Sequence, residues 1–106
     1  MQIGERQLGP VTQIPPGEGR AFEISRQRIA VFRNRQDALF ATQAECPHKG
    51  GPLADGLIGD TTLICPLHDW FFDLATGRLK NGECEIATYP VRASDDGQIL
   101  VTLQSG

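Results

Sequence analysis

Residues 46–53 read CPHKGGPL and residues 65–70 read CPLHDW, and these two short stretches decide how the whole chain is interpreted. Each stretch starts with a cysteine followed by a proline, and each carries a histidine two or three positions after its cysteine. Proline and glycine interrupt regular structure, so we expect both stretches to be loops between strands. Each loop then offers one thiolate and one imidazole, which are the side chains that bind soft and borderline metals.

The candidate ligands are Cys46 and His48 in the first loop and Cys65 and His68 in the second. They include both histidines of the chain and two of its three cysteines. Within each loop the spacing is short enough for the two donors to point the same way. The pattern therefore predicts that the two loops close around one metal centre.

Two other interpretations remain open at this point. Isolated cysteines and histidines often have only structural roles in a core. A tetrahedral zinc ion can also bind two cysteines and two histidines, although small zinc domains usually keep like ligands together, as C-x₂₋₄-C followed by H-x₃₋₅-H. Here each loop is mixed, which does not match that spacing. The third cysteine, Cys84, is expected to be a buried structural thiol.

Outside the loops, the sequence alternates between apolar and polar residues over short runs. Apolar residues share one face in three places: Phe22 with Ile24, Ile29 with Val31, and Ile99 with Val101 and Leu103. Glycines and prolines, 12 and 7 in number, separate these runs, and no stretch has a sustained helical period. We expect an all-β fold, a small antiparallel β-sandwich or barrel-like domain with the two candidate metal-binding loops, formed as a single domain by residues 1–106.

Two turns can be placed within this pattern. The segment from Arg92 to Leu103 is expected to form a hairpin, with Asp96 and Gly97 supplying the positive φ angles of a tight turn. Residues 71–73, FFD, are expected to form a strand that enters a glycine turn ending at Gly77.

Composition excludes several classes of function. The formal net charge of −3 argues against a nucleic-acid binder, and no polybasic segment is present to bind an anionic membrane. No window approaches the roughly 18 apolar residues of a membrane helix, and the N-terminus lacks the features of a secretory signal. An odd number of cysteines does not suit a disulfide framework, so a cytoplasmic location is expected.

The pattern C-x-H…C-x-x-H resembles the signature of Rieske iron–sulfur proteins, and the resemblance extends over most of the chain. It implies one [2Fe–2S] cluster per chain that passes single electrons. By the same resemblance, Cys46 and Cys65 would hold one iron, and His48 and His68 the other.

Departures from the respiratory members of this family indicate a low-potential type. The positions of their loop disulfide fall on Gly51 and Leu67, and the positions of their hydroxyl donors fall on Trp70 and Phe72. Hydrogen bonds to the sulfurs stabilise the reduced state, so their absence is expected to lower the potential toward roughly −150 mV.

Among low-potential relatives, the runs CPHKGGPLADG, CPLHDWFFDLATG and CEIATYPVR look like the small subunit of assimilatory NAD(P)H-dependent nitrite reductase. Residues 48–53 together with Trp70, Asp73 and Gly77 carry this similarity. It implies a large subunit with flavin and sirohaem as the partner, where nitrite becomes ammonium. The alternative is a free Rieske ferredoxin that serves an aromatic-ring-hydroxylating oxygenase and its reductase. In either case no catalysis is expected from the chain alone, because no nucleophile–base arrangement is evident.

Trp70 has two possible roles. It could form an apolar docking patch with Leu53, Pro66 and Leu67 around an exposed cluster edge. It could instead pack beneath the cluster as a support.

Overall fold

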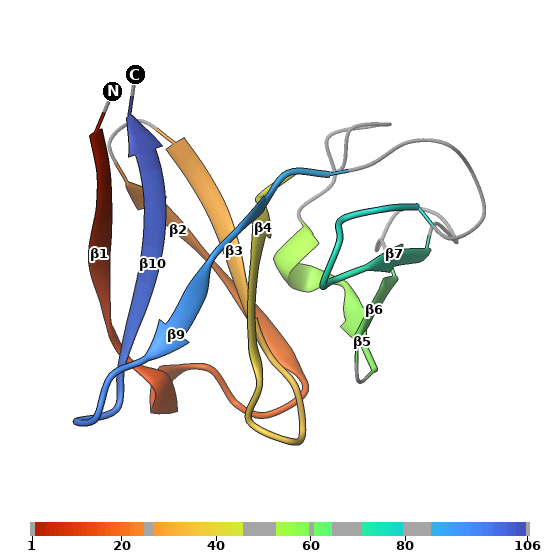
Figure 1. Ribbon diagram of the computed structural model, residues 1–106. Helices are drawn as coiled ribbons and strands as arrows, with labels where there is room; N and C mark the ends of the chain where they lie inside the picture. The colour runs from red at the N-terminus through yellow and green to blue at the C-terminus, as the bar shows by residue number, and fades with distance from the viewer. Residues whose placement is uncertain are drawn as a thin grey trace.

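The computed structural model describes residues 2–24, 27–45, 53–59, 61–64, 71–79 and 86–105. The elements within these ranges follow one another as β1 (Gln2–Pro10), η1 (Val11–Gln13), β2 (Glu18–Ile24), β3 (Gln27–Arg33), β4 (Leu39–Gln43), η2 (Leu53–Asp55), β5 (Leu57–Ile58), β6 (Thr62–Ile64), β7 (Phe71–Asp73), β8 (Thr88–Tyr89), β9 (Val91–Ala93) and β10 (Gln98–Ser105) (Figure 1). The η segments are single 3₁₀ turns. No helix in these ranges is long and apolar enough to cross a membrane.

The strands form three antiparallel sheets, which confirms the all-β prediction. Their orders are β1-β10-β9, β2-β3-β4-β8 and β5-β6-β7. The first two sheets face each other as a sandwich, and the small third sheet stands to one side of it (Figure 1). Strands β8 and β9 are separated only by Pro90, so the chain passes there from one sheet of the sandwich to the other.

Two buried clusters hold these layers together. The first, which we call the sandwich core, lies between the two large sheets and contains Ile14, Ile29, Val31, Ala41, Ile99 and Val101. The second, which we call the loop-side core, joins β3 to the small sheet and contains Ala30, Phe32, Leu53, Leu63, Phe72, Leu74, Leu79 and Ile86. Each fully buried large apolar side chain contributes roughly 1.5–3 kcal/mol of burial free energy.

Strand β3 is buried on both of its faces. Ile29 and Val31 share the face that points into the sandwich core, as the alternation predicted. Ala30 and Phe32, on the opposite face, are also fully buried, because the loop-side core covers them. The central sheet therefore lies between two apolar cores, which an alternating pattern along one strand could not indicate.

The two predicted turns are present, with one correction. Residues 92–103 form a hairpin in which Leu100 pairs with Arg92, and Gly97 has a φ of +80°. Asp96 does not share this positive φ. Instead the Gly97 N–H donates to the Ser94 carbonyl. The turn is therefore longer than a two-residue hairpin loop, and only Gly97, at its end, has a left-handed backbone conformation.

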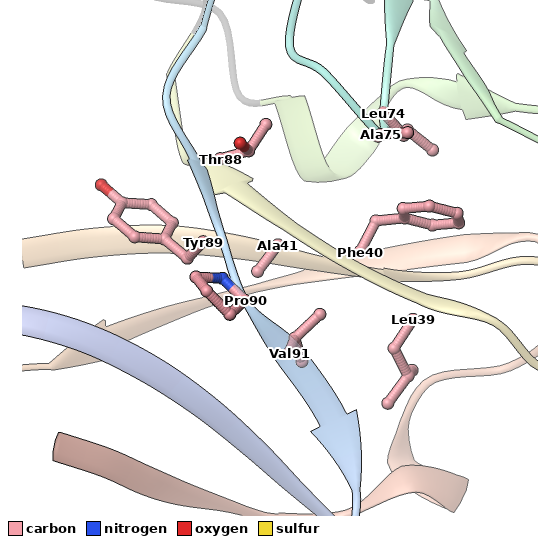
Figure 2. A pocket seen from close by; sticks show the side chains of 9 residues that line it. All are labelled: Leu39, Phe40, Ala41, Leu74, Ala75, Thr88, Tyr89, Pro90 and Val91. Carbon is pink, nitrogen blue, oxygen red and sulfur yellow. The ribbon is translucent and has the colours of Figure 1, made fainter.

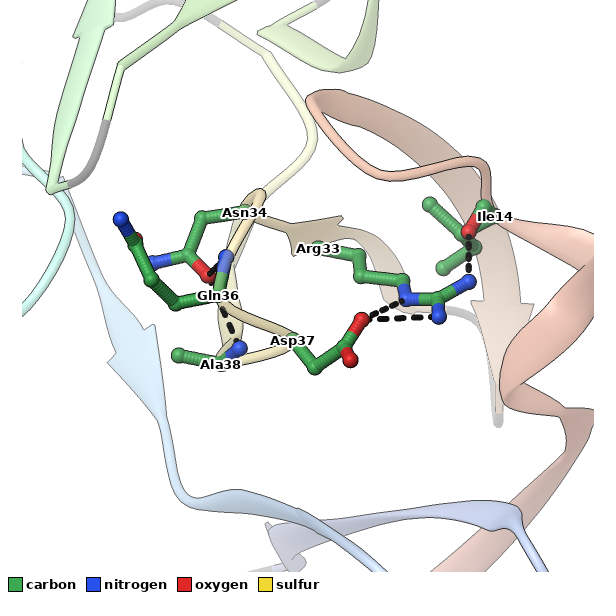
Figure 3. Close-up of polar contacts among 6 residues, drawn as sticks. All are labelled: Ile14, Arg33, Asn34, Gln36, Asp37 and Ala38. Carbon is green, nitrogen blue, oxygen red and sulfur yellow. Dashed lines mark hydrogen bonds and ion pairs between the residues drawn. The ribbon is translucent and has the colours of Figure 1, made fainter.

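The turn between β3 and β4 is held by side chains (Figure 3). Asn34 Oδ1 accepts a hydrogen bond from the Ala38 N–H at 2.9 Å. Arg33 Nε donates to Asp37 Oδ1 at 3.0 Å and Nη1 donates to the Ile14 carbonyl at 3.0 Å. Asp37 has a φ of +65°, a conformation that aspartate tolerates better than most residues. These bonds fix the register of β4, whose other end leads to the first predicted ligand.

The substitution Gly56→Ala tests the close approach of η2 to the small sheet. A Cβ at Gly56 would overlap the Ile64 carbonyl oxygen and lie 3.1 Å from the Leu53 carbonyl oxygen. Since backbone atoms cannot rotate away, we expect Gly56→Ala to lower the free energy of unfolding by about 1–3 kcal/mol. Gly59→Ala is the matched control, because nothing lies within 4 Å of its Cβ position. Urea unfolding of both variants measures the difference, and equal stabilities would contradict the packing described here.

Candidate metal centre

The four predicted ligands, Cys46, His48, Cys65 and His68, lie outside the described residues, as do Trp70 and Cys84. The assignment of the four ligands therefore stays a prediction. What the structure does describe is the framework at both ends of each predicted loop. This framework decides whether the two loops can serve one site.

The first predicted loop is closed at its base by a backbone hydrogen bond. The Leu53 N–H donates to the Ala44 carbonyl at 2.8 Å, and the Ala44 N–H in turn donates to the Arg28 carbonyl at 3.2 Å. Leu53, in η2, is fully buried. The chain thus leaves β4 just before Cys46 and returns to the same place just after Pro52.

The second predicted loop connects two paired strands. In the antiparallel pair β6–β7, Ile64 lies opposite Phe71, and these are the last described residue before Cys65 and the first after Trp70. Leu63 and Phe72, one position further from the loop on each strand, are fully buried in the loop-side core.

The bases of the two loops are joined to each other. Leu53 at the end of the first loop packs in the loop-side core with Leu63 and Phe72 from the second. In addition, Leu57 of β5 pairs with Ile64 of β6. The ligand-bearing segments thus start from one cluster of packed side chains, which favours a single shared site.

A third segment returns to the same framework. Leu79 forms a bridge with Phe72, and the Ile86 N–H donates to the Gly77 carbonyl at 2.7 Å. Residues 80–85, which contain Cys84, connect these two anchored points. Gly77 has a φ of +79°, and a Cβ there would overlap the Ile86 carbonyl oxygen, so the turn requires glycine.

The chemistry of the donor set fits an iron–sulfur centre with mixed ligation. All three cysteines and both histidines of the chain lie in the three segments that leave this framework. Two thiolates and two imidazoles are the ligands that a Rieske [2Fe–2S] cluster needs. Among the residues that the structure describes, no three His, Cys, Asp or Glu side chains lie together so as to hold a metal ion.

One apolar residue of the expected docking patch is not at the surface. Leu53 is fully buried in the loop-side core, so it cannot line an exposed cluster edge as the patch with Trp70 required. The structure instead exposes Phe71, which is 39% accessible beside the base of the second loop. In the sequence, the adjacent Phe71 and Phe72 do not indicate which ring is exposed, because the register of β7 determines which of the two faces solvent.

An open groove of about 430 Å³ lies between β4, the crossover from β8 to β9 and the turn that follows β7 (Figure 2). Leu39, Phe40, Ala41, Leu74, Ala75, Thr88, Tyr89, Pro90 and Val91 line it. Tyr89 is the one titratable side chain among these lining residues. These lining residues therefore offer no acid–base pair.

An ion pair that shifts the pKa of one of its members lies on the outer layer of the sandwich. Glu5 of β1 accepts two hydrogen bonds from the Arg92 guanidinium of β9, at 2.9 and 3.0 Å. The hydrogen bond and the charge of Glu5 raise the pKa of Arg92 above its ordinary value. Because a raised arginine pKa matters only at strongly alkaline pH, where Arg92 would lose its charge, this group adds no pH dependence near neutrality.

Comparison with known proteins now places the chain in a family. The profile of the Rieske [2Fe-2S] domain matches residues 5–90. The chain is 35% identical over 100 residues to the anthranilate 1,2-dioxygenase ferredoxin subunit of Burkholderia cepacia, which covers 91% of this chain and 89% of that protein. It is 40% identical over 86 residues to a nitrite reductase [NAD(P)H] of Emericella nidulans, covering 72% of this chain and 8% of that protein.

Other curated relatives are also much longer than this chain. A 4beta-methylsterol monooxygenase of Methylococcus capsulatus is 32% identical over 92 residues, and the match spans 76% of this chain but only 25% of that enzyme.

Solved structures share the whole fold. A protein of Mycobacterium tuberculosis assigned as the small subunit of an NADH-dependent nitrite reductase superposes with a TM-score of 0.91 at 19% identity, over 100% of both chains. A ferredoxin of Sphingomonas yanoikuyae B1 superposes with a TM-score of 0.82 at 31% identity, over 95% of this chain and 100% of that one. This chain belongs to the Rieske [2Fe–2S] family, whose domains bind one such cluster and transfer electrons.

Phe72→Leu tests whether the loop-side core supports both loops. Complete removal of a buried aromatic ring costs about 3–5 kcal/mol, and we expect the smaller change to leucine to cost about 1–2 kcal/mol of unfolding free energy. The neighbouring Phe71→Leu is the matched control, and its effect should stay within about 0.5 kcal/mol because that ring is partly exposed. Chemical denaturation of the two variants makes the comparison. A larger loss in Phe71→Leu would overturn the register that we describe for β7.

Proposed function

We propose that residues 1–106 act as one Rieske domain in which Cys46 and Cys65 bind one iron and His48 and His68 bind the other. The observation that carries this assignment is the common framework of the two loops, joined through Leu53, Leu63 and Phe72. When bound, a cluster of this type supplies a site for one electron at a time. The chain's own contribution is to bring two thiolates and two neutral imidazoles to one place.

The environment of the site supports a low reduction potential. Phe72, at a position where respiratory Rieske proteins carry a hydroxyl donor, is fully buried in the loop-side core and offers no hydrogen bond from its side chain. Fewer hydrogen bonds to sulfur leave the added electron less stabilised. Such a centre suits electrons that come from reduced flavin or nicotinamide.

The proposed partner is the large subunit of an assimilatory NAD(P)H-dependent nitrite reductase, with sirohaem and flavin. Support comes from the 40% identity to the Emericella nidulans enzyme and from the quoted runs around the loops. Asp73 and Gly77, which contribute to this likeness, also have a structural role: the Ala75 N–H donates to Asp73 Oδ1 at 3.0 Å, and Gly77 ends the turn. Reduction by NAD(P)H would place the chain in the cytoplasm.

A free Rieske ferredoxin for an aromatic-ring-hydroxylating oxygenase is the second candidate. The match to the Burkholderia cepacia ferredoxin subunit favours it, because each chain spans about nine-tenths of the other. In that case the chain would shuttle between a reductase and an oxygenase and would bind neither for long.

The ligand assignment is tested by metal content and spectroscopy. We expect a red-brown protein with about two irons and two sulfides per chain, and a reduced form with the low average g value of a histidine-ligated cluster. Cys46→Ser and His68→Ala should lose the cluster, whereas Cys84→Ser, the matched cysteine control, should keep it. A colourless protein with stoichiometric zinc would contradict the assignment, as would loss of the cluster in Cys84→Ser alone.

Co-expression with the large subunit from the same genome tests the proposed partner. We expect a complex that survives gel filtration, because a permanent subunit buries a stable apolar surface, unlike a shuttling carrier. NAD(P)H-dependent nitrite reduction should fall when the chain is omitted. A complex made with Cys46→Ser should form normally but reduce nitrite more slowly if the chain relays electrons. If the chain elutes alone and instead restores turnover of an oxygenase with its reductase, the ferredoxin function is correct.

A further inference from the structure

Gln43, the last residue of β4, makes an unusual set of hydrogen bonds beside the first predicted loop. Its side-chain Nε2 donates to the Glu45 carbonyl at 2.7 Å, and its Oε1 accepts from the Ala87 N–H at 2.9 Å. Its backbone N–H also donates to the Ala87 carbonyl at 2.9 Å. One glutamine thus holds both backbone groups of Ala87 and one of Glu45.

The side chain of Gln43 adds hydrogen bonds at the end of the described pairing between β4 and β8. On this edge of β4, Ala41 pairs with Tyr89 and Thr42 with Thr88, and the Gln43–Ala87 backbone bond comes next among the residues that the structure describes. Beyond it, the Gln43 amide group supplies a donor for Glu45 and an acceptor for Ala87. A glutamine does this with one rigid planar group, whereas an aliphatic side chain of the same size can do neither.

One of the two residues held by Gln43 borders the first predicted ligand loop, and the other lies just beyond residues 80–85. Glu45 is the last described residue before Cys46, and its carbonyl belongs to the peptide group that links it to Cys46. Because a peptide group is planar, a hydrogen bond to that carbonyl limits the rotation of the link. On the other side, Ala87 follows Ile86, which is the first described residue after residues 80–85.

We propose that Gln43 is a positioning residue for the cluster, which fixes the backbone entering Cys46 and ties it to the segment that returns at Ala87. The inference rests on the proposed assignment of Cys46 as a ligand, but not on the identity of the redox partner. Residues that orient metal ligands tune both the affinity for the metal and its potential, although they touch neither the metal nor the substrate.

The size of the effect follows from the setting of these bonds. Gln43 is half-buried and both side-chain hydrogen bonds are open to solvent, so water can replace part of what they contribute. A typical hydrogen bond to a neutral group corresponds to roughly a fivefold change in an equilibrium. We therefore expect cluster loss to quicken by about fivefold without collapse of the fold.

The test compares Gln43→Leu and Gln43→Glu with Gln13→Leu in the full-length chain carrying its cluster. Gln13 is the matched control, since it is also a half-buried glutamine whose Nε2 donates to a backbone carbonyl, that of Leu8, at 2.9 Å. It lies in η1, in a different part of the sandwich. Gln43→Glu keeps an acceptor for Ala87 but loses the donor to Glu45, so it isolates the bond that leads to Cys46.

Iron release to a chelator, the midpoint potential and the g values of the reduced cluster are measured for each variant, with circular dichroism to verify folding. We expect both Gln43 variants to release iron about fivefold faster and to shift the potential and g values, whereas Gln13→Leu keeps the parent values. If all three variants lose thermal stability alike while iron release, potential and g values stay unchanged, Gln43 is only a structural residue and the inference is wrong. If only Gln43→Leu has an effect, the contact with Glu45 is not the cause and the inference is likewise wrong.

Cys46→Ser, measured in parallel, separates this inference from the ligand assignment. If Cys46→Ser retains the cluster spectrum, the assignment of Cys46 fails and the inference about Gln43 fails with it. If Cys46→Ser loses the cluster while both Gln43 variants behave like the parent, only the inference about Gln43 is overturned.

Discussion

The rest of the structure depends on strand β3, which is buried on both faces in the middle of the molecule. Ile29 and Val31 on one face close the sandwich core, and Ala30 and Phe32 on the other support the small sheet and the bases of both predicted ligand loops. A polar side chain at any of these four positions would lose its contact with water without gaining a partner. The sandwich and the loop-bearing sheet are thus coupled through one strand, and damage to either core reaches both.

Much of the fold could be predicted from local patterns in the sequence. The hairpin over residues 92–103 and the turn at Gly77 follow from alternation and from glycine chemistry, which act between near neighbours. The second buried face of β3 could not be predicted, because it depends on η2 and on a sheet that begins at Leu57, well after the end of β3 at Arg33. Burial of Leu53 was missed for the same reason: within CPHKGGPL it looks like an exposed loop residue, but η2 packs it into the loop-side core.

For the candidate site, the sequence predicts the donors but not the residues that support them. Two cysteines and two histidines in mixed loops indicate their chemistry by residue type alone, and the family match agrees with it. The contribution of Gln43 has no comparable signal in the sequence, because its side-chain amide forms a hydrogen bond with Ala87, a residue 44 positions away. A glutamine at the end of a strand is usually solvated, and only the register of β4 against β8 shows that this one is engaged.

The pairing of β1 with β10 places the two ends of the chain next to each other, with Gln2 opposite Ser105, on the outer layer of the sandwich (Figure 1). The central sheet lies between this layer and the small sheet that bears the second predicted loop. A longer polypeptide could therefore enter and leave the domain at a single point, on the layer away from the small sheet. Such a domain can form part of a longer polypeptide without a change in its own fold. The matched region makes up only 25% of one longer relative and 8% of another.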